Sequence, residues 1–298
     1  MVTPTTSRFD VAAWGEAPDI SARSVLVTIF GDTVLPVTDE FWLAQLFRLT
    51  EAFGFSQRLI RTSMFRLASE GWLTNERVGR QSRYTLTALA IAETAQASSR
   101  IYRNAVPDWT GQWTLVLING TDADAQQRRD LIQHLQWQGF VSLGSGALAS
   151  PTARPDDVRA GMALLPRPVS TAVATATFED LDRLVADGFF DQALDLPAFE
   201  QAYRAFIDRY EPVAKSNRTT EPLAAFAMRT ALIHDLRRIR LRFPDLPGPI
   251  LASNPLADTA HQLAAGLYRQ LSERCAPALA EVLEVDYPPL PPGRFDDA

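Results

Sequence analysis

The segment 40–87 constrains the fold of this chain more than any other, because it reads as two helices followed by a hairpin. Residues 40–53 carry apolar side chains at the spacing of one helix face, and Gly54 follows where that helix would end. Ser56 is placed to cap a second helix over residues 57–70. Two helices joined by a short turn that contains glycine are typical of a helix-turn-helix.

The second helix is predicted to have one apolar face and one basic face. Its apolar residues follow one another a helical step apart: Ile60, Met64, Leu67 and Gly71. The opposite face carries polar side chains and one aromatic ring: Arg58, Arg61, Thr62, Phe65, Arg66 and Ser69. We therefore expect the first face to be buried and the second to be offered to a partner.

A basic hairpin follows this helix directly. Residues 72–78 lead into a turn at 79–82, and residues 83–87 alternate as a strand does. The hairpin carries Arg77, Arg80 and Arg83. A helix-turn-helix followed at once by such a hairpin is the winged-helix arrangement, with these three arginines on the wing.

Positive charge is concentrated in this one element. Between Ser56 and Tyr84 there are six arginines and two acidic residues, a local charge of +4, whereas the whole chain carries −6. A basic element in an acidic protein indicates a polyanion partner, and we expect double-stranded DNA. The alternative is an ordinary solvated face with surface arginines.

The types of side chain predict how DNA would be read. Arginine forks suit guanine and apolar groups suit the thymine methyl, so Arg58, Arg61 and Arg66 are candidates for base contacts and Thr62 and Phe65 for thymine. Phe65 fits an interface between domains equally well. Arg77, Arg80 and Arg83 would contact phosphates, which makes binding strongly salt-dependent.

The remaining sequence predicts an α+β protein of several parts. Residues 1–20 lack a clear period and are expected to form a flexible leader, and the winged-helix domain would span 21–106. Residues 107–188 read as most of a ferredoxin-like α+β domain, 189–287 as a helical domain, and 288–298 as an extended, proline-rich tail. The expected helices are 22–30, 87–103, 122–138, 179–186, 196–210, 221–242 and 255–275, and the expected strands are 113–118, 140–143, 161–165 and 171–178.

The sequence offers no constellation of reactive groups that would support an enzyme. His134, His234 and His261 are far apart, and no pair of them has the spacing of metal ligands. Gly144-Ser145-Gly146 is not the nucleophile elbow of hydrolases, and Cys275 is better explained as a packing residue. Since the apolar runs are too short to cross a bilayer and charges interrupt any signal-peptide core, we expect a cytoplasmic protein without a membrane partner.

Several segments together resemble the PaaX family of transcriptional repressors. They are Ser24–Asp32, Phe55–Thr74, Glu76–Leu86, Arg100–Ile118 and, more weakly, Ala231–Pro247. The resemblance implies a repressor of an aromatic-acid catabolic operon such as that for phenylacetate, with a helical C-terminal region that forms a homodimer. It also implies release from the DNA operator by an aryl-acyl-CoA, typically phenylacetyl-CoA, and no cofactor.

An arginine run on the predicted helix 221–242 would suit the phosphates of such an effector. It comprises Arg237, Arg238, Arg240 and Arg242. The alternative is a solvated helix end, whose cations face the C-terminal dipole.

Two further functions stay open beside the repressor. One is a CoA-thioester-binding interaction protein without a DNA role. The other is a nuclease, because the middle region is similar to the small ferredoxin-like nucleases of CRISPR adaptation. Asn119-Gly120 stands where those nucleases have an aspartate, and Asp122 and Asp124 lie beyond it, which makes the nuclease the weaker of the two.

Overall fold

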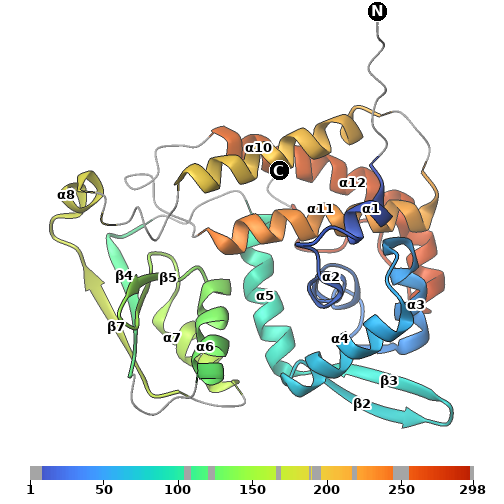
Figure 1. Cartoon of the computed structure of the whole chain (residues 1–298), viewed down its shortest axis with the longest axis horizontal. Coiled ribbons are helices and arrows are strands. Elements are labelled where there is room, and N and C mark those ends of the chain that lie inside the picture. The colour runs from blue at the N-terminus through green and yellow to red at the C-terminus, as the bar shows by residue number, and fades with distance from the viewer. Residues whose placement is uncertain are drawn as a thin grey trace, which may run out of the picture. The chain divides into compact units, whose positions relative to one another are not determined.

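The computed structural model describes residues 9–103, 109–119, 125–165, 169–187, 189, 196–216, 220–243 and 255–295. The chain divides into two compact units that each combine distant segments of the sequence. Unit 1 comprises residues 1–91, 204–236 and 259–298, and unit 2 comprises residues 92–203 and 237–258. Figure 1 labels their elements. The domain boundaries expected at 20, 106, 188 and 287 stay predictions.

The N-terminal part of unit 1 contains the two predicted helices and the hairpin. Ser21 and Ser56 accept hydrogen bonds from the backbone N–H groups of Ser24 and Leu59 at 3.2 Å, which confirms both as helix caps. Gly54 has a φ of +75°, the left-handed conformation that ends the preceding turn. The elements are α1 (Val11–Gly15), α2 (Ala22–Ile29), the π-helix η1 (Phe30–Val34), β1 (Glu40–Trp42), α3 (Leu43–Thr50), the 3₁₀ turn η2 (Glu51–Phe53), α4 (Gln57–Ser69), β2 (Leu73–Val78) and β3 (Gln81–Leu86).

Two predicted helix boundaries in this region are wrong. Residues 40–53 do not form one helix, since β1 pairs antiparallel with β3 and gives a three-stranded sheet of order β1-β3-β2. Helix α3 starts only at Leu43, with Trp42 as its N-cap residue. The side chain of Gln45 accepts a hydrogen bond from the backbone N–H of Trp42 at 2.8 Å, so this N–H at the start of the helix has an acceptor. Helix α2 does not end at Gly31 but continues as the π-helix η1.

The expectation of a flexible leader is wrong for the described residues 9–19. Trp14 of α1 is only 6% exposed, and its ring lies 5.9 Å from that of Phe53. Its indole N–H donates to the Asp235 carboxylate at 3.3 Å. A single tryptophan in a stretch without periodicity is therefore enough to anchor α1 in unit 1.

Three long helices follow the predicted pattern in the C-terminal part. They are α10 (Leu196–Ala214), α11 (Pro222–Arg242) and α12 (Pro255–Leu283), and α12 continues past its predicted end at Cys275. Within unit 1, the fully buried Arg229 of α11 pairs with Asp32 of η1 at 3.2 Å. Tyr268 of α12 donates its hydroxyl to the same carboxylate at 2.9 Å. Helices α11 and α12 are thus fastened to the π-helix by a buried polar cluster.

The predicted extended tail is also held in unit 1 as far as it is described. Residues 288–295 contain no helix or strand. Arg294 donates to the Gly31 carbonyl at 2.7 Å, and Arg269 of α12 donates to the Phe295 carbonyl at 2.9 Å. The ring of Phe295 is buried 5.3 Å from that of Tyr268.

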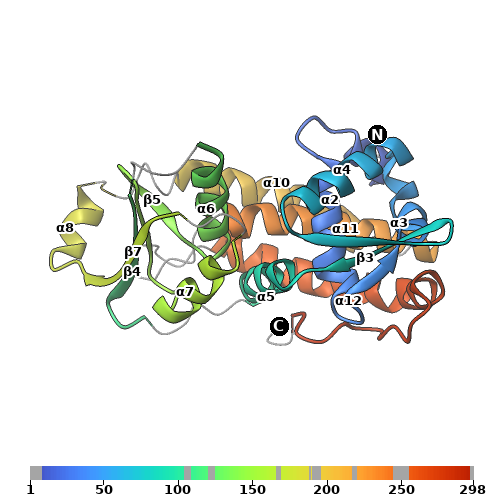
Figure 2. The ribbon, with the colours of Figure 1, turned by 90° about the horizontal axis from the view of Figure 1, so that it is seen from below.

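Unit 2 contains an antiparallel sheet of order β5-β6-β4-β7, with the chain order strand, helix, strand, strand, helix, strand. Helices α6 and α7 cover the same face of this sheet, as Figures 1 and 2 both show. There Val116, Ile118 and Leu148 pack against Leu131 and Leu135 of α6 and Val158 of α7. The elements of this part of the chain are α5 (Ala88–Tyr102), whose first four residues belong to unit 1, β4 (Gln112–Ile118), α6 (Ala125–Trp137), β5 (Val141–Gly144), β6 (Ala147–Ser150), α7 (Pro155–Ala163), β7 (Thr171–Thr177) and α8 (Leu181–Ala186).

One strand of this sheet was predicted in the wrong place. Residues 161–163 are the end of α7, residues 164–165 follow that helix, and the missing strand is β6 at 147–150. Its sequence contains no β-branched residue, so its strand propensity is low, and it is fixed instead by pairing with β5 and β4. Pro155 in the first turn, followed by Asp156 and Asp157, is a helix-start signal that identifies α7.

Candidate nucleic-acid interface

Helix α4 offers a broad surface because only one of its faces is buried. Ile60, Met64 and Leu67 are fully buried, as the sequence pattern predicted. On the opposite face Phe65 is 74% exposed, the largest value among the exposed large apolar side chains of the described residues. An apolar ring held so far in solvent has no role in the packing of α4.

The predicted contact residues are not equivalent on α4. With about 100° per residue, Arg58, Thr62, Phe65 and Ser69 fall within an arc of roughly 60° at the centre of the exposed face. Arg61 and Arg66 lie on its two flanks. The Arg61 guanidinium stacks 5.0 Å above the ring of Phe47 on α3, which directs it away from the centre.

The hydroxyl groups on this face are already used within the helix. Thr62 donates to the carbonyl of Arg58 at 3.0 Å, and Ser69 donates to the carbonyl of Arg66 at 2.8 Å. Each hydroxyl has thereby used its one donor hydrogen, so hydrogen bonds donated to DNA from these positions would come from the arginine guanidinium groups.

The hairpin β2–β3 carries the remaining basic residues of this region. Its loop consists of Gly79 and Arg80, and only Gly79 has a positive φ, +62°, as in a two-residue hairpin loop with glycine first. Arg80 is exposed at the tip, while Arg77 donates from Nε to the Gly79 carbonyl at 3.3 Å. In Figure 1 the hairpin extends beyond α4 as a separate arm.

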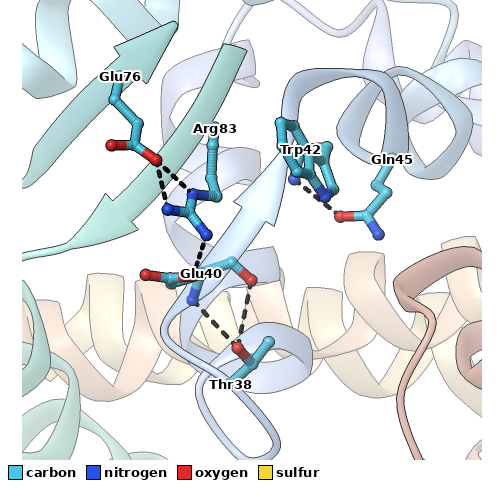
Figure 3. Close-up of polar contacts among 6 residues, drawn as sticks. All are labelled: Thr38, Glu40, Trp42, Gln45, Glu76 and Arg83. Carbon is cyan, nitrogen blue, oxygen red and sulfur yellow. Dashed lines mark hydrogen bonds and ion pairs between the residues drawn. The ribbon is translucent and has the colours of Figure 1, made fainter. Parts of the chain in front are cut away.

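Arg83 differs from the other arginines because two carboxylates hold it (Figure 3). It donates from Nε to Glu76 of β2 at 2.7 Å and from Nη1 to Glu40 of β1 at 3.1 Å. The hydrogen bond to Glu76, and then the charges of Glu40 and Glu76, raise the pKa of Arg83 above its ordinary value. Its guanidinium also lies 5.9 Å from the Trp42 ring.

The acidic residues of this region are thus neutralised locally. Glu76 is bound to Arg83, and Glu70 at the end of α4 is bound to Arg23 of α2, with Arg23 Nε 3.0 Å from the carboxylate. Within the part of the chain that the structure describes, five arginines of the surface make no ion pair with a carboxylate: Arg58, Arg61, Arg66, Arg77 and Arg80.

Sequence reasoning missed three residues that shape this surface: Arg23, Glu40 and Trp42. Glu40 and Trp42 were assigned to a helix, because the two aromatic residues that follow Glu40 continue the apolar pattern of α3. Arg23 lies on a helix far from the hairpin in sequence, and no local pattern points from it to Glu70.

The arginine run predicted for an effector lies on the part of α11 that belongs to unit 2. Arg240 donates to the carbonyls of Arg100 at 2.8 Å and Arg103 at 3.2 Å, and Arg237 stacks 5.6 Å from the Trp137 ring. Arg238 is exposed. These contacts give Arg237 and Arg240 a structural role, and an effector contact by the run stays a prediction.

The residues considered for catalysis are dispersed. His134 is buried between Glu93 and Gln138, and His234 lies against Ser24. Cys275 is fully buried, and burial raises the pKa of its thiol. In the described residues no group of three His, Cys, Asp or Glu side chains could hold a metal ion.

Two further observations concern predicted features elsewhere in the chain. Asn119 follows β4, whereas Gly120, Asp122 and Asp124, weighed for a nuclease, lie outside the described residues. No helix in the part of the chain that is described has the length and hydropathy needed to cross a membrane.

Comparison with known proteins places nearly all of these elements in one family. Three family models match in succession: PaaX-like protein over residues 21–90, the PaaX protein central Cas2-like domain over 106–183, and the PaaX-like protein C-terminal domain over 194–281. A curated relative, the transcriptional repressor PaaX of Escherichia coli K12, is 32% identical over 288 residues, which cover 92% of this chain and 88% of the relative.

A solved structure of the uncharacterized protein Rv0674 from Mycobacterium tuberculosis aligns with 87% of this chain and 98% of its own. Its TM-score of 0.44 and identity of 21% are too low to carry an argument. The three family models and the curated relative agree with each other over most of the sequence, and the chain belongs to the PaaX family.

Proposed function

We propose that this protein is a DNA-binding transcriptional repressor of an aromatic-acid catabolic operon. The observation that carries the proposal is the surface of α4 and the hairpin, where three arginines lie on the helix that exposes Phe65, two more lie on the hairpin, and none of the five has a carboxylate partner among the described residues. Arginine-rich surfaces of this kind bind phosphates by counterion release. The curated relative is named a transcriptional repressor, which supports the same function.

The topology supports two finer assignments of fold. Helices α3 and α4 with the three-stranded sheet fit a winged helix-turn-helix, in which α4 would enter the major groove and the hairpin would follow the backbone. The chain order and strand order in unit 2 fit a ferredoxin-like domain.

The positions on α4 divide the work of recognition between its residues. Arg58, at the centre of the exposed face, is the best placed to reach a guanine edge. Thr62 and Phe65 beside it would contact thymine methyl groups. Arg61 and Arg66 on the flanks, with Arg77 and Arg80 on the hairpin, would bind phosphates. The alternative for Phe65, an interface between domains, stays a prediction.

Induction requires an effector that binds the DNA-incompetent arrangement more tightly than the competent one. We propose an aryl-acyl-CoA such as phenylacetyl-CoA in that role, and a homodimer that binds a pseudo-palindrome with half-sites about one helical turn apart or a multiple of it. By linkage, DNA must then weaken effector binding by the same factor. Arg238 and Arg242 are the exposed members of the arginine run, and Arg238→Glu tests a contact of the run with the CoA phosphates.

The experiment is a titration of the purified protein with the DNA upstream of its own gene, against a scrambled duplex, at several salt concentrations and with phenylacetyl-CoA or free CoA. Specific, salt-dependent binding that phenylacetyl-CoA reverses and free CoA does not would support the repressor and its effector. Specific binding that ignores the thioester would keep the DNA role and reject this effector. Binding of the thioester without any specific DNA binding would favour an interaction protein instead.

Two arginine variants locate the interface. Arg58→Ala is expected to weaken operator binding by about 1–3 kcal/mol and to relax the base preference at one position. Arg159→Ala is the matched control, because this arginine lies on α7, half exposed and paired with Asp156. If both variants bind equally well, α4 is not the recognition element.

A further inference from the structure

Arg83 occupies the centre of the three-stranded sheet that carries the hairpin. On the middle strand β3 it lies directly opposite Glu76 of β2 and Trp42 of β1 in the strand register. Glu40 is two residues from Trp42 on β1, so its side chain leaves the same face. One guanidinium thus reaches side chains on all three strands.

The contacts of Arg83 use three of its donor groups. Nε and Nη2 donate to one oxygen of Glu76, and Nη1 donates to Glu40. Thr38 supports the second acid, because its hydroxyl accepts from the Glu40 N–H at 3.1 Å and fixes the start of β1 (Figure 3). A planar guanidinium suits such a bridge, since its donors point in fixed, diverging directions.

The charge balance argues against a phosphate contact at this position. With Glu40 and Glu76 beside it, the cluster has a net charge of −1, and a phosphate that approached it would meet two carboxylates. Arg80 at the hairpin tip has no ion pair among the described residues, and neither does Arg77. The two kinds of arginine on one hairpin are therefore electrostatically different.

The hairpin also needs a support of this kind. A two-stranded hairpin is marginally stable alone, and the third strand β1 is only three residues long. A side chain that links β2, β3 and β1 restricts how the hairpin can tilt.

We propose that Arg83 is a positioning residue of the hairpin, which Glu40 and Glu76 hold so that Arg77 and Arg80 are presented to the DNA backbone. The inference rests on the proposed DNA-binding function. It removes Arg83 from the phosphate-contact set expected from the sequence, and it assigns a function in DNA binding to two acidic residues.

The substitution Glu76→Gln separates the two roles by the sign of its effect. If Glu76 only masks a phosphate-binding Arg83, its neutralisation tightens operator binding. If Glu76 holds Arg83 in place, the same substitution weakens binding, by about threefold or more. Arg83→Lys is the second variant: a lysine would keep a phosphate contact but cannot bridge both carboxylates, so the positioning role predicts weaker binding.

Arg83 is expected to affect DNA binding only through Arg77 and Arg80, so a protein that lacks these two arginines serves as the control. In an Arg77→Gln/Arg80→Gln background, Glu76→Gln should have no further effect on operator affinity, whereas a merely general loss of stability would still lower it. Arg80→Gln alone should reduce the slope of log K against log salt concentration by about 0.9, as expected for one phosphate contact.

Amide hydrogen exchange tests, without DNA, whether the bridge from Arg83 to Glu40 and Glu76 stabilises the hairpin. Glu76→Gln and Arg83→Lys should speed exchange of the β2 and β3 amides, while Arg80→Gln should not. Tighter operator binding by Glu76→Gln, or unchanged exchange in the hairpin, would overturn the positioning role and leave the DNA function intact. If the wild-type protein binds no operator but the two variants show faster hairpin exchange, the proposed function is overturned and the role of the Arg83 bridge in holding the hairpin still stands.

Discussion

The buried pair of Arg229 and Asp32 is expected to be a major determinant of the stability of unit 1. Arg229 is fully buried, and besides Asp32 it donates to Thr33 at 3.0 Å, Tyr287 at 3.1 Å and Ser272 at 3.2 Å. Burial alone would lower the pKa of Arg229, but neighbouring Tyr287 and Asp32 raise it well above its ordinary value, so the guanidinium stays charged.

The substitution Arg229→Met keeps an unbranched apolar stem and removes every donor. It leaves the Asp32 carboxylate buried without its main counter-ion, and breaking a buried pair from one side costs about 3–5 kcal/mol. The matched control is Arg48→Ala, because Arg48 pairs with Glu281 at 2.9 Å while their side chains are 52% and 73% exposed. An exposed pair of that kind contributes about 0–1 kcal/mol.

Urea denaturation followed by tryptophan fluorescence measures both variants, since Trp14, Trp42 and Trp72 lie in unit 1. With a slope of about 2–3 kcal/mol per molar urea, Arg229→Met should lower the midpoint by roughly 1–2 M, and Arg48→Ala by less than about 0.5 M. The double variant Asp32→Leu/Arg229→Met should lose less than the sum of its single variants, because it removes both charges of this pair together. Equal losses for Arg229→Met and Arg48→Ala would refute the reasoning.

Three further predictions concern other contacts. Phe65→Ala should weaken operator binding by about 1 kcal/mol. Replacing the contacted thymine by deoxyuridine, which lacks the methyl group, should weaken binding of the wild type by about 0.8 kcal/mol but leave binding of the variant unchanged. Fluorescence anisotropy with substituted duplexes measures both effects, and equal losses in the two proteins at every thymine would contradict the contact. Gly161→Ala should destabilise unit 2 by about 1–3 kcal/mol, although alanine favours the helix more than glycine does. The new Cβ would lie 2.8 Å from His134 Nε2 and 2.9 Å from Gln138 Nε2, which is too close. An unchanged or higher melting temperature would show that the two side chains move aside. Burial would raise the pKa of Asp235, but hydrogen bonds from His234 and Tyr210 and the charge of Arg209 outweigh burial and lower this pKa. The Asp235 carboxylate therefore stabilises the fold fully above the pKa of an unfolded aspartate, and this stabilisation is lost as pH falls through the lower pKa of the folded state. Asp235→Asn should therefore flatten the loss of stability below about pH 4 in acid-unfolding titrations, and an unchanged acid limb would argue against the lowered pKa.

The parts of the interface that depend on local sequence were predicted correctly. Ser56, Gly54 and the apolar spacing of α4 act within one or two helical turns, and such signals are readable from a single sequence. The faces of α4 follow from the same spacing. The strand β1 was missed because its aromatic residues also continue the apolar pattern of α3, and only pairing with β3 distinguishes the two.

The contacts that depend on distant segments could not be read in this way. Nothing near Arg83 in the sequence shows that Glu40 lies beside it, because that contact depends on the register between β1 and β3. Arg229 lies in a helix whose other residues are mostly apolar, and its burial depends on Asp32, far away in the sequence. Both arginines look alike in the sequence, yet one bridges strands on the surface and the other is enclosed.

Unit 1 combines three separate segments of the chain, which limits how this protein could have been assembled and how it can be divided. Its N-terminal segment packs with residues 204–236 and 259–298, where Phe226 meets Phe53 and Arg229 meets Asp32. A fragment that ends after the hairpin would therefore leave Asp32 without its partner Arg229 and Phe53 without its contact to Phe226. The segment 22–86 is consequently not a portable module: gene fusion or recombination that moves it into another protein must carry residues 204–236 and 259–298 with it.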